Sequence, residues 1–127
     1  MRLLTGLSWA AFALASAHVV VGIVMAFVPN PEGWAGGIFF AVSYGVPLLL
    51  IGLALRSSRP ALHSGAGWAA LLIGVYYALI VIGNWSGYSS QTALFAVGIT
   101  VPTVALDLII FWATVLRRSG RPAKTTS

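Results

Sequence analysis

Long apolar stretches alternate with short polar breaks along this chain. Four such stretches run over residues 3–28, 37–55, 66–83 and 92–116. Each is close to the length of about 20 residues that an α-helix needs to cross the hydrocarbon core of a bilayer. The breaks between them are rich in Pro, Gly, Ser and Asn, residues that favour turns. The pattern therefore predicts four transmembrane helices.

Two alternatives to this pattern fit the residues less well. Strands of a membrane barrel would alternate apolar and polar residues over about ten positions, whereas residues 19–28 are continuously apolar. The N-terminus also imitates a signal peptide, because Arg2 precedes an apolar segment and the small residues Ala15 to Ala17. Cleavage there would leave an apolar stub too short to span a membrane. We therefore expect an uncleaved first helix.

The overall composition supports a membrane location. Of the 127 residues, 59% are hydrophobic and 7% are charged, and the mean hydropathy is +0.95. A soluble domain is about a quarter charged, because its surface must face water. This composition excludes a water-soluble enzyme, and the absence of cysteine excludes disulfides and thiolate metal sites. We expect an all-α integral membrane protein.

The charged residues predict how the helices are oriented. The net charge is +5, and every Lys and Arg lies at the edge of an apolar stretch: Arg2, Arg56, Arg59, Arg117, Arg118, Arg121 and Lys124. With four spans these residues all fall on one side of the membrane, and the other side carries only Glu32. The positive-inside rule then predicts that both termini are cytoplasmic. The same positions argue against nucleic-acid binding, because they form no basic face.

The polar segments complete the predicted layout. Residues 1–116 form one transmembrane domain, and residues 117–127 are expected to be a disordered, basic cytoplasmic tail. The break at residues 56–65 is expected to be a cytoplasmic loop in which His63 is solvated. The preference for Arg over Lys and the abundance of Ala and Gly suggest a bacterial protein of the inner (plasma) membrane.

Small residues at helical spacing predict how the helices pack. The third stretch carries one at every fourth position: Ala66, Ala70, Gly74 and Ala78. Such a row lets a neighbouring helix approach closely. Because the connections are short, we expect sequential helices to form an antiparallel four-helix bundle. Pro47 and Pro102 lie inside the second and fourth stretches and are expected to kink them.

Two ionisable residues lie at membrane depth, His18 in the first stretch and Asp107 in the fourth. Such a residue costs several kcal/mol unless it is partnered, so each is a functional candidate. By helix rise, Asp107 lies about 14 Å and His18 about 22 Å from the cytoplasmic helix ends. A direct contact between them therefore needs helix tilt or an intermediary. With no Lys or Arg within reach, the Asp107 carboxyl is expected to be protonated or held by tyrosines, threonines or His18.

Other polar and aromatic side chains are predicted to line a site with these two residues: Tyr44, Tyr76, Tyr77, Thr103 and Trp112. On the fourth stretch, Thr100, Thr103, Asp107 and Thr114 follow steps of three, four and seven residues, which place them on one helix face. Each residue alone also has a structural explanation, since His, Thr and Tyr often hydrogen-bond locally and Asp can join helices. Their combination favours a site.

Three functions follow from these candidates. The first is an enzyme or binding protein for a lipophilic small molecule, with Asp107 and His18 as acid/base residues in isomerase- or cyclase-type chemistry, for example on a terpenoid. The second is a non-enzymatic subunit that docks a larger membrane partner or a second copy of itself. The third is a proton-coupled transporter. Two histidines and two acidic residues are too few for a metal site, so no metal or other cofactor is expected.

Overall fold

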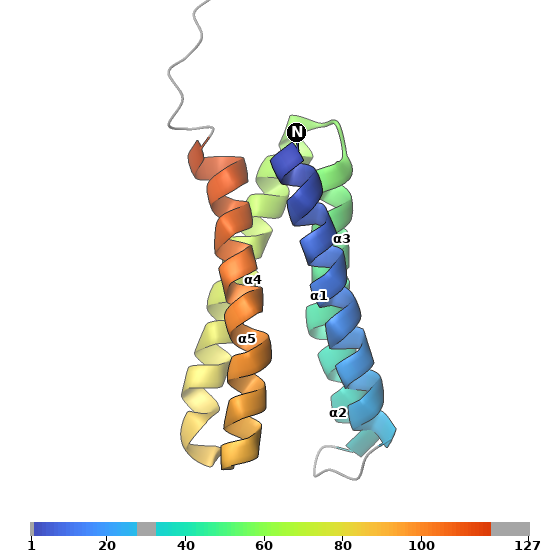
Figure 1. The fold of residues 1–127 in the computed structure, drawn as a ribbon, viewed down its shortest axis with the longest axis vertical. Coiled ribbons are helices and arrows are strands. Elements are labelled where there is room, and N and C mark those ends of the chain that lie inside the picture. The colour runs from blue at the N-terminus through green and yellow to red at the C-terminus, as the bar shows by residue number, and fades with distance from the viewer. Residues whose placement is uncertain (1, 28–32, 118–127) are drawn as a thin grey trace, which may run out of the picture. The chain divides into compact units, whose positions relative to one another are not determined.

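The computed structural model of this chain describes residues 2–27 and 33–117, and all of its regular structure there is helical (Figure 1). Its elements are α1 (Arg2–Phe27), α2 (Gly33–Phe40), the π-helix η1 (Ala41–Gly45), α3 (Val46–Arg56), α4 (Pro60–Asn84), the 3-10 helix η2 (Trp85–Gly87), α5 (Ser90–Phe111) and the π-helix η3 (Trp112–Leu116). No strand occurs in these two ranges. The helical prediction is confirmed.

Four of the helical segments are long and apolar enough to cross a membrane: Arg2–Phe27, Trp34–Arg56, Pro60–Gly87 and Ala93–Leu116. They coincide with the four predicted stretches to within a few residues at most ends. By length and composition, the chain is therefore a multi-pass membrane protein. The predicted cytoplasmic tail lies outside the described residues from position 118 onward.

The prediction that His63 lies in a solvated loop is wrong. Helix α4 begins at Pro60, and His63 lies in its first turn with 4% of its surface exposed. Proline suits the first position of a helix, because its missing N–H needs no partner there and its φ is already helical. Only three residues, Ser57 to Arg59, therefore separate α3 from α4.

The described helices form two compact units that divide after Ser58. We call α1, α2, η1 and α3 the first hairpin, and α4, η2, α5 and η3 the second hairpin. In the first hairpin, α1 packs along α2, η1 and α3. Gly22 of α1 faces Gly37 of α2. A Cβ on Gly37 would collide with the backbone of Gly22, so α1 and α2 touch through their main chains. Further along, the Ser8 hydroxyl donates a 2.9 Å hydrogen bond to the Gly52 carbonyl.

In the second hairpin, α4 packs along α5 and η3 through its row of small residues. Ala66, Ala70 and Gly74 are buried, as the four-residue spacing predicts. A Cβ on Gly67 would collide with the Thr114 hydroxyl. Gly67 contacts Thr114, and Gly74, seven residues later on α4, contacts Asp107, seven residues earlier in the chain than Thr114. The two helices therefore run in opposite directions, as expected for a helical hairpin. The small residues therefore determine which side of α4 faces α5.

The two intramembrane prolines differ in their surroundings. The wider π turn of η1 ends at Gly45, two residues before Pro47, whose ring cannot fit against the carbonyl four residues earlier in a regular α-helix. In contrast, α5 continues from Ser90 to Phe111 through Pro102. The π turn at η1 carries Tyr44, which belongs to the candidate site described below.

Candidate functional site

Asp107 lies on α5 and none of its surface is exposed. Its side chain rests directly on the α4 backbone, because a Cβ placed on Gly74 would lie 3.0 Å from the Asp107 Cβ and 3.2 Å from Oδ2. A side-chain carbon at position 74 would therefore press against the carboxyl group, which would have to shift by a few tenths of an ångström. The row of small residues on α4 and the acidic residue on α5 are therefore parts of one arrangement.

The Asp107 carboxyl has no hydrogen-bond partner in the described part of the chain. Both oxygens are buried, and neither meets a donor or acceptor there. An isolated carboxylate in an apolar interior loses its hydration, which costs several kcal/mol. Because neither oxygen is used in a hydrogen bond within the described ranges, the carboxyl group can exchange a proton or bind a polar atom that comes from outside the hairpin.

The threonines beside Asp107 divide into two kinds. The Thr103 hydroxyl donates to the Ile99 carbonyl and the Thr114 hydroxyl to the Ile110 carbonyl, both at 2.7 Å. These bonds return to the same helix, as is common for threonine. Thr100 is also buried, but its hydroxyl has no hydrogen-bond partner among residues 2–27 and 33–117. Sequence spacing does not separate Thr100 from Thr103, so only the geometry identifies Thr100 as the exception.

His18 is the centre of an aromatic cluster in the first hairpin. Its ring stacks on Phe40 with centroids 5.2 Å apart, and it lies 6.0 Å from the ring of Tyr44. Nδ1 lies 2.7 Å from the Leu14 carbonyl oxygen. Since a carbonyl only accepts, Nδ1 carries the hydrogen, and the neutral ring then presents Nε2 as a base. Phe40 cannot be recognised as part of this cluster from the sequence, because an apolar aromatic residue in an apolar stretch gives no distinctive signal.

Three of the predicted substrate-binding residues take different positions in the second hairpin. Tyr77 is buried, whereas its neighbour Tyr76 is 57% exposed. Consecutive residues of a helix point about 100° apart, so the two rings cannot both face α5. Trp112 is 50% exposed, and the Arg117 guanidinium lies 5.9 Å from its ring. Tyr76 and Trp112 therefore lie on the outside of the hairpin, and we leave them out of the proposed site.

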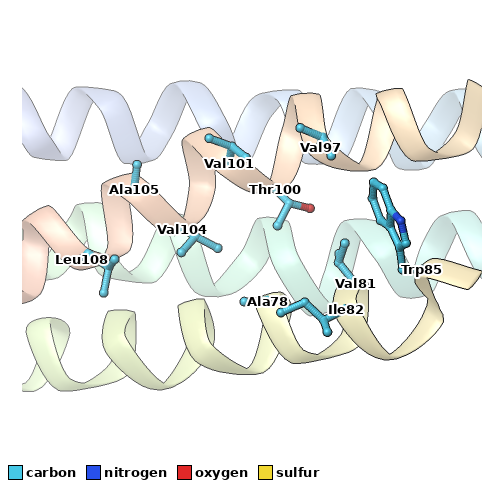
Figure 2. A pocket seen from close by; sticks show the side chains of 10 residues that line it. All are labelled: Ala78, Val81, Ile82, Trp85, Val97, Thr100, Val101, Val104, Ala105 and Leu108. Carbon is cyan, nitrogen blue, oxygen red and sulfur yellow. The ribbon is translucent and has the colours of Figure 1, made fainter.

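Each hairpin also carries an apolar groove between its helices. The groove of the second hairpin has a volume of about 480 Å³ (Figure 2). It is lined by Ala78, Val81, Ile82, Trp85, Val97, Thr100, Val101, Val104, Ala105 and Leu108. The groove of the first hairpin has a volume of about 400 Å³, and Phe12, Val19 and Leu49 are among its lining residues. The groove of the second hairpin is the one that includes Thr100, whose hydroxyl has no hydrogen-bond partner in the described ranges.

No group of three or more His, Cys, Asp or Glu side chains that could hold a metal ion occurs in the described ranges. The candidate residues offer one carboxyl group and several hydroxyls in the second hairpin, and one imidazole in the first. No protein family, curated protein or solved structure matches this chain.

Proposed function

We propose that this protein binds a lipophilic small molecule within the membrane and exchanges a proton with it through Asp107. The observation that carries the proposal is the Asp107 carboxyl, which is fully buried without a hydrogen-bond partner from the described residues. A group that served only to hold the hairpin together would be expected to bond to the neighbouring helix. Asp107 instead abuts Gly74, which offers no side chain.

The proposed chemistry is isomerisation or cyclisation, with Asp107 in its neutral acid form as the proton donor. Donation of its proton to one carbon of a double bond, or to an epoxide oxygen, would form a cation. The resulting carboxylate would then remove a proton from a neighbouring carbon, which regenerates the acid, so that no proton is consumed. Aromatic faces can stabilise such a cation.

Infrared spectroscopy tests the protonation on which this chemistry depends. A protonated carboxylic acid has a carbonyl stretching band that ionised carboxylates lack. The chain contains only two acidic side chains, so two variants suffice to assign the band. In an ester-free detergent at neutral pH, we expect the band in the wild type and in Glu32→Gln, and its loss in Asp107→Asn. Absence of the band from the wild type, or its loss in Glu32→Gln alone, would contradict the proposal.

For the membrane arrangement, we propose an antiparallel four-helix bundle in the bacterial plasma membrane, with both termini cytoplasmic. The support is the absence of Lys and Arg from the two segments predicted to face outward. The chain has no cysteine, so a single introduced thiol can be labelled without background. We expect an impermeant maleimide to label Gly87→Cys in intact spheroplasts and Ser58→Cys only after lysis. The reverse result would invert the topology.

Two other functions use the same buried carboxyl. Asp107 could pair with a polar group of a larger membrane partner or of a second copy of this chain, or it could titrate in a proton-coupled transporter, which would need an oligomer to form a path. The first alternative does not require a proton on Asp107, and the second does not require a bound lipophile. The infrared measurement and the ligand experiments described below therefore separate them from the proposed enzyme.

A further inference from the structure

The groove of the second hairpin has the dimensions of a small-molecule site. Its volume of about 480 Å³ lies within the usual range for ligand pockets, which is roughly 300 to 1,000 Å³. It runs between α4 and α5, from Trp85 in η2 to Leu108 on α5 (Figure 2). Along α5, the distance from Val97 to Leu108 corresponds to about 16 Å. The groove is therefore long and apolar, which suits an extended hydrocarbon chain.

One polar group interrupts this apolar lining. Thr100 is only 7% exposed, and its hydroxyl oxygen is buried with no hydrogen-bond partner in the described ranges. Figure 2 shows this hydroxyl among the apolar side chains that line the groove. A buried hydroxyl without a partner is destabilising, because it has lost its hydration and nothing replaces it. A ligand with an oxygen atom at this point of the groove would supply the missing partner.

The depth of Thr100 distinguishes between possible occupants. The membrane-spanning part of this helix begins at Ala93, so Thr100 lies about 10 Å along the helix from that end. The acyl chains of a phospholipid carry no oxygen at that depth, because their ester groups stay at the membrane interface. We propose that the groove binds a single-chain lipophile that carries a hydroxyl, ketone or epoxide oxygen within its hydrocarbon part, hydrogen-bonded to Thr100.

This binding site would deliver the lipophile to the depth of the acid. Leu108, at the deep end of the groove, directly follows Asp107 on α5. A chain that enters near Trp85 and holds its oxygen at Thr100 would extend about two helical turns further, to the level of Asp107. The inference rests on the proposed function for the fate of the bound molecule, but binding itself does not need the proton of Asp107.

Binding of two matched probes tests the inference. Tritiated hexadecane and its mid-chain ketone are titrated into the full-length protein in phosphatidylcholine nanodiscs. We expect the ketone to bind about fivefold more tightly than the alkane, the ratio given by one ordinary hydrogen bond. Thr100→Val should remove this preference without weakening alkane binding, and Thr100→Ser, which keeps a hydroxyl, should retain it.

Two tryptophan substitutions locate the site. Val101 lines the groove and Val42 does not, and both are more than half exposed. We expect Val101→Trp to reduce binding of both probes at least tenfold and Val42→Trp to leave it unchanged. Equal binding of ketone and alkane by the wild type, which would indicate ordinary lipid contact, would overturn the inference. Unchanged probe binding in Val101→Trp would also overturn it. If that variant altered the oligomeric state while probe binding stayed unchanged, the groove would be a helix-docking surface and the inference would equally fail.

A fifth variant separates this inference from the proposed function. Asp107→Asn should bind both probes as the wild type does, because the groove lining does not include Asp107. If the infrared band of a protonated Asp107 were absent while the ketone preference persisted, the proposed acid chemistry would fail and the binding site would stand. If the band were present and the ketone preference absent, the binding site would fail alone.

Discussion

Replacing Gly74 with leucine should prevent correct folding of the second hairpin. Even the first carbon of a side chain at this position would lie 3.0 Å from the Asp107 Cβ, and the rest of a leucine would need space that α5 occupies. Overpacking of this kind costs about 1 to 3 kcal/mol, and more where a backbone must move. We expect little monodisperse Gly74→Leu protein on size-exclusion chromatography in detergent, and a lowered melting temperature, followed by tryptophan fluorescence, for any that remains.

Gly65 provides a matched control on the same helix. A Cβ at Gly65 would meet nothing within 4 Å, so Gly65→Leu should fold with wild-type yield. Leucine also favours the helix over glycine by up to about 1 kcal/mol. Equal losses in Gly65→Leu and Gly74→Leu would indicate a general intolerance of α4 to bulk. Normal yield of Gly74→Leu would mean that α4 and α5 do not pack through Gly74.

Replacing Asp107 with asparagine should abolish activity on the lipophile while leaving a folded protein. Asparagine keeps the shape of the side chain but cannot act as the acid, and general acid–base catalysis contributes about a hundredfold or more to rate. Lipophiles that co-purify with the wild type would be identified by mass spectrometry and returned to each variant in nanodiscs, with conversion followed over time. A folded and fully active Asp107→Asn variant would end both the enzyme and the proton-transport proposals and favour the accessory subunit.

The Asp107→Leu variant distinguishes a functional acid from a structural one. Leucine replaces the two carboxyl oxygens with two methyl groups on a similar branched frame. Because neither oxygen has a partner in the described ranges, this change should leave the melting temperature equal or higher, as when a buried polar group without a partner is replaced by an apolar one. A large loss of stability in Asp107→Leu, with Asp107→Asn unaffected, would instead show that the carboxyl bonds to a partner.

His18→Gln tests whether the imidazole acts together with the acid. The amide of glutamine is not basic, so it cannot replace the imidazole Nε2 as a base, and the substitution also removes the ring that stacks on Phe40. If the two residues form one catalytic unit, the double variant with Asp107→Asn should be little worse than either single variant, because residues that act as a unit are not additive. If the loss of activity in the double variant equalled the product of the two single losses, the two residues would act independently.

Much of the fold follows from the sequence alone. A transmembrane helix must satisfy its backbone hydrogen bonds internally and face lipid, so apolar length directly predicts its position. Small residues at four-residue spacing likewise predict the buried side of α4. Burial of His18 and Asp107 follows for the same reason, since lipid exposure of an ionisable group is costly. The start of α4 was predicted too late, because polar composition suggested a loop where Pro60 begins a helix.

Only the tertiary structure decided which polar groups are already satisfied. Thr100 and Thr103 share a helix face, yet one hydroxyl is unused and the other bonds to its own backbone. Tyr76 and Tyr77 are adjacent, yet the helix turns one outward and the other inward. The contact of Gly74 with Asp107 and the stacking of Phe40 on His18 join residues far apart in the chain. Such pairings depend on the register between helices, which is set by side-chain packing and is not encoded in the hydropathy pattern of either helix alone.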